Sequence, residues 1–389
     1  IDTRDWSSDV CSSDLLDDVV EFLDTMRKPL EGAKRISGPY PYYGASGIVD
    51  YVDGYLFDEE LILLSEDGAN ITDRNYPVCF LASGKYWVNN HAHVLRTKHG
   101  NENNFICNSL ERKDYTQYNT GMAMPKLNKE TCKKIPILCP GFEEQKKIGD
   151  YFRNLDNLIA LHQRKLEKLK EYKKGMLQKM FPKNGEKIPE VRVPGFTDDW
   201  EQRKFSELCD MVTVGIANSA THAYSDSGIV MFRNQNIKPN FLDDNDIIHI
   251  NPEFEARYKN KRLKKNDLLV ARTGYPGTAC VVPEKYENSQ TFTTLIARPK
   301  NSVNPYFLCQ YLNSDIGVKY FESTQIGGGQ KNSGAGILNE MPIMLPSVVE
   351  EESKIADYFN HLDNLITLHQ RKLEMLKEFK KGCLQQMFV

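Results

Sequence analysis

Several short stretches of the sequence contain residue types that could do chemistry, but none of them completes a catalytic motif. Residues 327–334 (GGGQKNSG) resemble a glycine-rich phosphate loop, yet the Lys-Ser or Lys-Thr pair that should follow the last glycine is missing. Asn251-Pro252-Glu253 and Asn304-Pro305-Tyr306 do not form the Asn- or Asp-Pro-Pro-aromatic tetrapeptide that an amino-methyltransferase needs. HExxH, GxSxG and a cluster of paired carboxylates with a lysine are also missing. We therefore predict no catalytic residues in this chain.

The cysteines indicate neither a disulfide framework nor a metal site. There are nine, at positions 11, 79, 107, 132, 139, 209, 280, 309 and 383, with no CxxC pair and no metal-ligand spacing. Reduced thiols and a cytoplasmic location are the simplest interpretation. No apolar run reaches the roughly 18 residues of a membrane-spanning helix. We predict no metal and no cofactor bound by this chain.

An internal repeat in the sequence predicts the main structural elements, which would position any functional residue. Residues 143–181 and 350–388 match at 29 of 39 positions at a constant offset of 207 residues. In both copies apolar residues recur at alternating steps of four and three, which is the heptad period of a helix that packs along a partner helix. Neither copy contains proline. We predict two long helices that pack on each other within the chain.

The seam of these helices consists of equivalent positions in the two copies. His162 and His369, and Lys173 and Lys380, are polar seam positions, which usually fix the register of a helix pair rather than bind a ligand. The predicted helix–helix packing residues are Ile148, Phe152, Leu155, Ile159, Leu166, Leu169, Ile355, Phe359, Leu362, Ile366, Leu373 and Leu376.

The chain between and before the helices divides into two unlike globular units. Alternating aromatic and β-branched residues predict strands at 77–83 and 85–97, and again at 229–237, 266–283 and 291–299. Residues 304–324 are predicted to be helical. The start of the sequence has no initiator Met, and its WSSDVCSSDL resembles translated adapter sequence, so residues 1–14 are expected to be foreign and the first unit truncated. The predicted order is 1–14 non-native segment, 15–140 first globular unit, 141–181 first long helix, 182–195 linker, 196–346 second globular unit and 347–389 second long helix.

The charge of the chain bears on polyanion binding only locally. A formal net charge of −3 argues against general polyanion binding, but duplex binding needs a basic face rather than a basic total. Residues 143–181 contain ten Lys or Arg against six Asp or Glu. The basic stretch Arg164, Lys165, Lys168, Lys173 and Lys174 fits a solvated helix face better than a DNA contact.

Taken together, these motifs closely resemble the specificity subunit of type I restriction–modification systems. The resemblance is carried by EEQKKIGDYF, LDNLIALHQRKLEKLKEYKKGMLQKMF, GFTDDWEQRK and IPILCP, and it covers residues 15–389. HQRKLE with KKGMLQKMF, repeated after each globular unit, is highly specific. PYPYYGASGIVDYVDGYLFD, SEDGAN and VNNHAHVL look like one variety of the first target-recognition domain. The GFTDDWE-type entry of that first domain is absent.

The resemblance implies an α+β fold with two target-recognition domains, each followed by a long helix. The two helices would pack as an antiparallel coiled coil with pseudo-two-fold symmetry and set the spacing of two DNA half-sites. The implied function is recognition of a bipartite, interrupted DNA target, which directs adenine methylation or ATP-dependent cleavage by partner subunits. The implied partners are double-stranded DNA, two modification subunits that use S-adenosylmethionine, and two restriction subunits that use ATP and Mg²⁺.

Within that family frame, candidate DNA contacts are side chains that present paired donors and acceptors at strand ends and turns. A structural interpretation stays open beside it, with Tyr42 and Tyr43 as strand residues and Asn89-Asn90 as a turn. The candidates are Lys34, Arg35, Tyr42, Tyr43, Asn89, Asn90 and His91 in the first unit, and Arg233, Asn234, Gln235, Asn236, Arg272, Thr273, Gln330, Lys331 and Asn332 in the second.

Two other classes of function remain as alternatives. The chain could be a non-catalytic fragment of a fused restriction–methylation enzyme, which the missing methyltransferase motifs disfavour. It could also be a coiled-coil adaptor that binds no nucleic acid. The near-identical helices between unlike globular units favour the DNA-recognition subunit.

Overall fold

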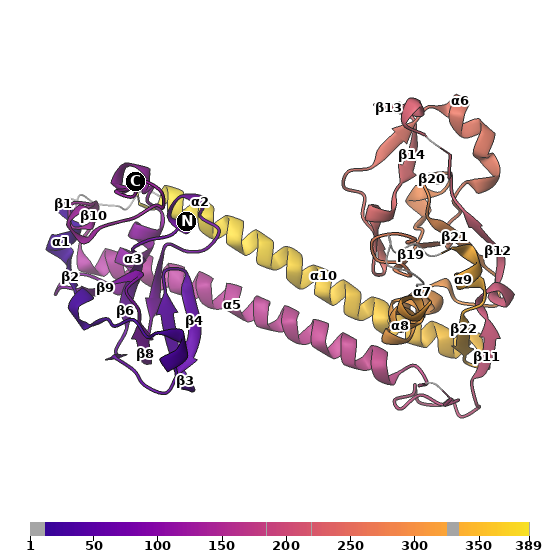
Figure 1. Ribbon diagram of the computed structural model, residues 1–389, viewed down its shortest axis with the longest axis horizontal. Coiled ribbons are helices and arrows are strands. Elements are labelled where there is room, and N and C mark those ends of the chain that lie inside the picture. Colours follow the sequence, from indigo (N-terminus) through magenta and orange to yellow (C-terminus); the bar gives the residue numbers. More distant parts are fainter. Residues whose placement is uncertain (1–11, 184, 219, 325–333, 389) are drawn as a thin grey trace. The chain divides into compact units, whose positions relative to one another are not determined.

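The structure is a computed structural model that describes residues 12–183, 185–218, 220–324 and 334–388 (Figure 1). It divides into two compact units, one made of residues 1–163 and 371–389 and the other of residues 164–370. Each unit holds one α+β domain and a part of each of two long helices, α5 (Phe142–Lys179) and α10 (Val349–Gln386). Among the described residues, no helix is both long and apolar enough to span a bilayer.

The α+β domain of the first unit contains two four-stranded sheets. Its elements are β1 (Ser12–Leu15), α1 (Leu16–Val19), β2 (Val20–Phe22), β3 (Ser37–Gly44), β4 (Gly47–Val52), β5 (Phe57–Asp58), β6 (Leu61–Ser65), α2 (Asn70–Asp73), β7 (Cys79–Ala82), β8 (Lys85–Val88), β9 (Ala92–Thr97), α3 (Asn103–Glu111), α4 (Lys129–Cys132) and β10 (Pro136–Cys139). One sheet has the antiparallel order β2-β9-β6-β7. The other has the order β4-β3-β8-β5, in which β3 and β8 are parallel.

Strand β6 shows why this domain has two hydrophobic cores. All five of its residues are buried, although successive side chains of a strand point to opposite faces. Ile62 and Leu64 pack with α3 and the start of α5, whereas Leu61 and Leu63 pack against the second sheet. The apolar run LILLS is therefore a strand covered on both faces.

The α+β domain of the second unit repeats this plan with a different sequence. Its elements are β11 (Glu201–Lys204), β12 (Cys209–Val214), β13 (Tyr224–Ser225), β14 (Ile229–Phe232), β15 (Ile237–Lys238), β16 (Phe241–Leu242), β17 (Ile248–Ile250), α6 (Pro252–Glu255), β18 (Leu268–Val270), β19 (Ala279–Val281), β20 (Gln290–Thr291), β21 (Leu295–Pro299), α7 (Pro305–Asn313), α8 (Asp315–Ser323), α9 (Ala335–Asn339) and β22 (Pro342–Leu345). The sheets have the orders β12-β21-β18-β19 and β13-β17-β14-β20, with β14 and β20 parallel. The predicted α+β class is confirmed in both domains.

The entry strand of the first domain begins earlier than the sequence analysis expected. Residues 12–14, which were set aside as foreign, form β1 and pair antiparallel with β10, as β11 pairs with β22 in the second domain. A two-stranded ladder of this kind is held by backbone hydrogen bonds, so it tolerates unrelated side chains. Residues 1–11 lie outside the described part of the chain.

Helices account for two further differences from the sequence-based expectation. Helix α3 was not anticipated, because its asparagines are weak helix formers. It is stabilised instead by the Glu102 carboxylate, which accepts a hydrogen bond from the Phe105 amide at 2.6 Å, and by a buried apolar face. The helix expected over residues 304–324 is divided into α7 and α8 at Ser314, where the backbone is extended.

The long helices pair antiparallel within each unit. In the first unit Lys380 Nζ donates to the Asp156 carboxylate at 2.6 Å, and Phe388 packs on Phe152 at 5.6 Å between ring centroids. In the second, Lys173 Nζ donates to Asp363 at 2.5 Å. The offset of 207 residues converts one ion pair into the other, so the same interhelical contact forms once in each unit. This pairing agrees with the register role expected for the two seam lysines.

The predicted packing residues of the helices face the interior of their own units. Eight of the twelve are fully buried, and the other four are half-buried. The buried ones are Ile148, Phe152, Leu155, Leu166, Ile355, Phe359, Leu362 and Leu373, and the half-buried ones are Ile159, Leu169, Ile366 and Leu376.

Candidate nucleic-acid interface

In the second unit, the loops that follow β14, β18 and β20 meet around a hollow of about 720 Å³. Strands β14 and β20 are parallel neighbours, so their carboxyl ends lie at the same edge of their sheet. The loop after β18, in the other sheet, is attached there by the Arg272 amide, which donates to Asn234 Oδ1 at 2.8 Å. This edge brings together five predicted residues, namely Arg233, Asn234, Gln235, Arg272 and Thr273.

Two of the predicted residues hold this edge together rather than face outward. The Asn234 side chain accepts from the Arg272 amide and donates to Thr293 Oγ1 at 3.2 Å. Asn236 is only 1% exposed, and its amide donates to the carbonyls of Asp243 and Asn245. The prediction of a base contact by Asn236 therefore meets a structural obstacle, because its hydrogen-bonding groups are spent inside the domain.

Arg233 and Gln235 converge on one exposed carboxylate. Arg233 Nη2 lies 2.8 Å and Gln235 Nε2 lies 2.7 Å from Asp246 Oδ2, and the Asp246 side chain is 75% exposed. An ion pair open to water contributes only about 0–1 kcal/mol. The guanidinium and the amide can therefore exchange this carboxylate for a phosphate or a base edge at little cost.

Tyr275 is a candidate that the sequence analysis missed. It lines the same hollow and is 84% exposed, in the turn between β18 and β19. An exposed aromatic ring beside basic and amide side chains is suited to stacking on a base. The signal in the sequence was the Tyr in ARTGYPG, an aromatic residue within a glycine-proline turn. Lys238 and Thr293, which line the hollow as well, were also missed.

The first unit presents a matching edge, formed by the loops after β3, β6 and β8. Strands β3 and β8 are parallel, and the Asn89 backbone amide donates to the Tyr43 carbonyl at 3.0 Å. Ser65, at the end of β6, donates through its hydroxyl to the Ala45 carbonyl. The equivalent loops of the two domains thus converge in the same way, although their sequences differ.

Several residues predicted at this first edge serve the fold. Tyr42 is 1% exposed, its hydroxyl accepts from the Leu30 amide at 2.9 Å, and the Arg35 guanidinium lies 4.6 Å above its ring. Tyr43 is half-buried, and burial raises the pKa of its hydroxyl. Asn89 is 6% exposed and accepts from the His91 amide at 2.8 Å. The structural interpretation of Tyr42 and Asn89 is favoured, because burial leaves them little surface for an external base.

Among the predicted residues of the first edge whose burial the structure describes, Asn90 and His91 are exposed. They form the turn between β8 and β9, and His91 Nδ1 lies 2.9 Å from Asp67 Oδ1. Arg35 is half-buried and also pairs with Asp50 at 3.2 Å. Lys34 ends a short 3-10 turn, Gly32–Lys34.

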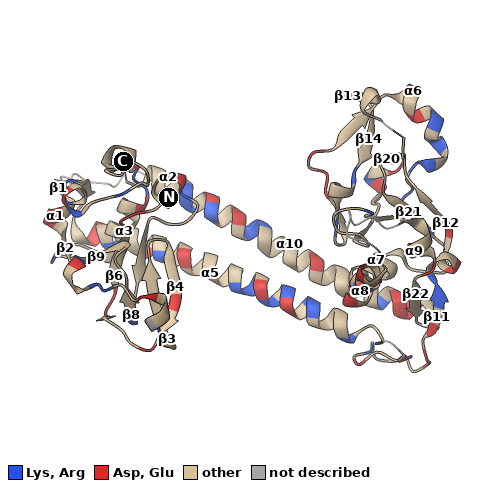
Figure 2. Cartoon of the chain, in the orientation of Figure 1, with Lys and Arg blue, Asp and Glu red and all other residues tan. Residues whose placement is uncertain are grey.

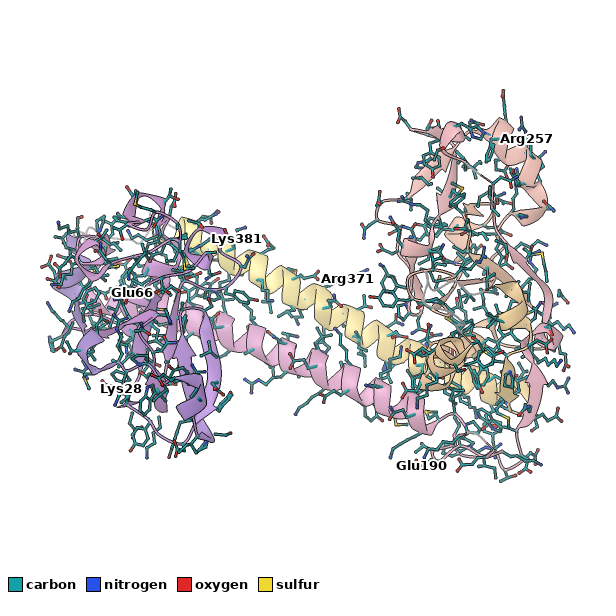
Figure 3. All side chains as sticks on the ribbon, viewed as in Figure 1. Lys28, Glu66, Glu190, Arg257, Arg371 and Lys381 are labelled. Atoms are coloured by element: carbon teal, nitrogen blue, oxygen red, sulfur yellow. The ribbon has the colours of Figure 1, made fainter. Side chains whose placement is uncertain are left out.

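A buried polar network supports this turn from below. His93 is 1% exposed, and its two ring nitrogens lie 2.7 Å from Asp24 Oδ2 and 2.8 Å from the Leu127 carbonyl oxygen. Both ring nitrogens lie within hydrogen-bonding distance of oxygen atoms, which fixes the orientation of the ring. Burial disfavours the charge of Asp24, but the hydrogen bond and charge of His93, with Arg27, keep the pKa of Asp24 below its usual value. Arg27 also pairs with Glu66, which is labelled in Figure 3, at 2.6 Å.

The remaining predicted residues do not join these edges. Gln330, Lys331 and Asn332 lie outside the described residues. In the basic stretch of α5, the prediction of a solvated face is wrong for Lys173, which is 8% exposed and paired with Asp363 between the helices. Among the described residues, no group of three or more His, Cys, Asp or Glu side chains is arranged to hold a metal ion.

The sequence matches a known family over most of its length. The family described as type I restriction modification DNA specificity domain matches residues 15–171 and 197–378. The chain is 28% identical over 365 residues to a Haemophilus influenzae protein named as a type I restriction enzyme specificity subunit, covering 90% of this chain and 88% of that one. It is 21% identical over 387 residues to the specificity subunit of the type I restriction enzyme MjaVIII from Methanocaldococcus jannaschii, covering 94% and 88%.

Solved structures show the same fold. The S subunit of the type I restriction–modification system from M. genitalium matches with a TM-score of 0.64 at 11% identity, covering 100% of this chain and 98% of that chain. A structure described under the complex assembly and conformational transition of the type I R-M system matches with a TM-score of 0.51 at 15% identity, covering 95% and 97%. At these identities the likeness concerns the fold alone.

Proposed function

The chain belongs to the family of type I restriction–modification DNA specificity subunits, and on this premise we propose that each α+β domain reads one half of a bipartite, interrupted DNA target. The proposal rests on the observation that equivalent loops of the two domains meet at one edge. In both, loops from two different sheets converge and bring polar side chains to one edge. Divergent loops on one scaffold suit two half-sites of different sequence.

In the second domain, Arg233, Gln235, Arg272, Thr273 and Tyr275 form the reading surface. Arginine and glutamine offer bidentate contacts to guanine and adenine in the major groove. Asp246 keeps Arg233 and Gln235 extended together in the absence of DNA. Asn234 acts as a positioning residue, because it joins the loops after β14, β18 and β20.

In the first domain, Arg35, Asn90 and His91 form the reading surface. His91 is held by Asp67, and the buried network of Asp24, Glu66 and His93 lies behind that pair. A turn supported by fixed charges loses little conformational entropy when it binds.

The two long helices set the distance between the half-sites in this proposal. Each helix is 38 residues long, which corresponds to about 57 Å at roughly 1.5 Å per residue. Half-sites must be met on a set face of the duplex, so a rigid spacer of constant length is required. The interhelical ion pairs Lys173–Asp363 and Lys380–Asp156 would fix the register of that spacer.

We further propose that this chain performs no catalysis and acts with two modification subunits and two restriction subunits. S-adenosylmethionine, ATP and Mg²⁺ would then be bound by those partners. Large apolar side chains are exposed at equivalent positions of the two helices, Leu161 and Leu368, and Tyr172 and Phe379, at 44% to 60% exposure. Two equivalent apolar surfaces suit two copies of one partner.

The test is genome-wide mapping of methylated adenines after co-expression with the neighbouring modification subunit in a host that lacks methylation. An interrupted two-part motif is expected, and Arg233→Ala should relax or abolish only one of its halves. No stable complex with the modification subunit would refute the proposal and favour a coiled-coil adaptor. Methyl transfer by the purified chain alone would instead favour a fragment of a fused enzyme.

A further inference from the structure

A second hollow lies in the first unit, away from the reading loops, between α3, the start of β7 and the two long helices. Its volume is about 770 Å³, which is within the range of small-molecule sites, roughly 300–1000 Å³. Six cationic side chains line it against two carboxylates, Glu111 and Asp156. Lys and Arg recur on this part of α10 in Figure 2, and Figure 3 labels Lys381 among them. The six cations are Arg74, Arg112, Arg153, Lys377, Lys380 and Lys381.

Half of this positive charge has no carboxylate to balance it. Arg74 pairs with Glu111, Arg153 with Glu60 and Glu102, and Lys380 with Asp156. Within the described residues, no salt bridge joins Arg112, Lys377 or Lys381 to a carboxylate. Burial lowers the pKa of Arg112, as expected for a cation that has lost water without gaining a counter-ion. An anion in the hollow would supply that counter-ion.

The equivalent place in the second unit is bridged by a side-chain contact. There, Gln310 of α7 donates to Asp363 of α10 at 3.1 Å and links the domain to the helix. The equivalent residue of α3 is Asn108, which is one methylene shorter and donates to Asn104 instead. Both helices are in the same register, since Glu102 caps α3 where Asn304 caps α7. Among the described residues, no hydrogen bond joins Asn108 to Asp156, so the amide contact that Gln310 makes with Asp363 is missing beside the hollow.

The charges also differ between the two units. The offset of 207 residues places Asn360 where the first unit has Arg153, and the shared helix register places Ser314 where it has Arg112. The lysines of the helices, in contrast, are present in both copies. The first unit thus combines extra space with extra positive charge from its own domain, which helix pairing alone does not require.

We propose that this hollow binds a phosphate-bearing anion of nucleotide size, with its phosphates on Arg112, Lys377 and Lys381. The apolar wall formed by Leu81, Ile159 and Leu384 would take the rest of the ligand. Arginine and lysine are the side chains that bind phosphate oxygens with charge-assisted hydrogen bonds. Phosphate esters could come from a free nucleotide or from a DNA backbone. A concave site fits the free nucleotide better than a duplex, which would meet only its rim.

Calorimetric titration of the full chain with inorganic pyrophosphate, ATP and adenosine tests this site. Pyrophosphate and ATP are expected to bind and adenosine to bind at least about tenfold more weakly, because it lacks the charged groups. The double variant Lys377→Ala/Lys381→Ala should lose about tenfold or more in affinity for both phosphates. The matched control is Lys170→Ala/Lys174→Ala, which removes the equivalent lysines of the other copy and should leave binding unchanged.

The variant Asn108→Gln tests the space in the hollow independently of its positive charge. The longer amide should reach Asp156 as Gln310 reaches Asp363, cross the hollow beside α3 and weaken the binding of ATP while all six cations remain. Circular dichroism checks whether Asn108→Gln folds. If Asn108→Gln does not fold, the double variant Lys377→Ala/Lys381→Ala remains as the test of the site. No binding of pyrophosphate or ATP by the unmodified chain, or equal binding by the lysine variant and its control, would overturn the proposal.

A short duplex added as competitor identifies the source of the phosphate. Displacement of pyrophosphate by the duplex, lost in Lys377→Ala/Lys381→Ala, would assign the site to the DNA backbone. Binding of ATP that the duplex does not displace would assign it to a free nucleotide. The outcome is independent of target recognition, because the mapped methylation motif depends on the reading loops and not on this hollow.

Discussion

The buried carboxylate of Glu352, in α10, is expected to affect the stability of the second unit. Its side chain is 3% exposed, and its carboxylate accepts one hydrogen bond, from the Asn304 amide at 2.7 Å. Burial raises its pKa from the usual 4.5 to about 7, although that hydrogen bond acts in the opposite direction. At the equivalent position of the first unit the residue is Gln145, whose amide accepts from the Glu102 amide and donates to the Pro140 carbonyl. We expect Glu352→Gln to stabilise the second unit.

The size of the effect follows from the two pKa values. The unfolded chain releases the Glu352 proton near pH 4.5, whereas the folded unit keeps it until about pH 7. Between these values the folded state binds the extra proton, so the unfolding free energy falls as pH rises, by about 1.4 kcal/mol per pH unit. The loss amounts to roughly 3 kcal/mol by pH 8. Glu352→Gln removes the titration, and its advantage should be greatest at pH 8 and nearly gone below about pH 4.5.

Urea unfolding between pH 5 and pH 8 measures this difference, provided that the signal comes from the second unit. Trp200 lies buried in that unit, and a Trp6→Phe/Trp87→Phe background leaves it as the only tryptophan. The converse variant Gln145→Glu should place the same pH-dependent penalty on the first unit. The reasoning is refuted if Glu352→Gln and the parent unfold at the same urea concentration at pH 8, or if the difference does not change with pH.

Three further outcomes are expected. Lys173→Met should lower the unfolding free energy by about 1–2 kcal/mol, and adding Asp363→Leu should restore part of that free energy in a double-mutant cycle measured by urea unfolding. Lys380→Met should lower the unfolding free energy by less, because its partner carboxylate is 47% exposed. Asp24→Asn should lower the melting temperature near pH 7, because His93 loses the carboxylate that lies 2.7 Å from its Nδ1. Its depressed pKa means that this contribution exists above about pH 4 and disappears as acid protonates it, so parent and variant should converge in acid. Tyr275→Ala should weaken duplex binding of the complex with the modification subunit by about 1–3 kcal/mol in fluorescence anisotropy without changing its melting temperature; unchanged affinity would remove Tyr275 from the reading surface.

The site was predictable only in part, and the reason is the same in both domains. Side-chain chemistry and position at strand ends singled out Arg233, Gln235, Arg272 and Thr273, which the fold does bring together. The same criteria also selected Asn236, whose amide is consumed inside its own domain. Whether a polar residue faces water or a buried carbonyl depends on loops that are distant in sequence, and a pattern of residue types does not carry that information.

The sequence by itself determined the repeat, the two long helices and their seam, whereas the α+β class was implied by the family resemblance. These features are periodic and local, so spacing along the chain converts directly into faces of helices and strands. Only the tertiary structure decided that two unlike domains share the strand order of one sheet and that loops from separate sheets meet at one edge. It also decided that Gln310 reaches Asp363 whereas the equivalent Asn108 donates to Asn104. Each of these depends on contacts between segments far apart in the chain. Such contacts are set by the length of a side chain, down to one methylene, and local propensity carries no information about them.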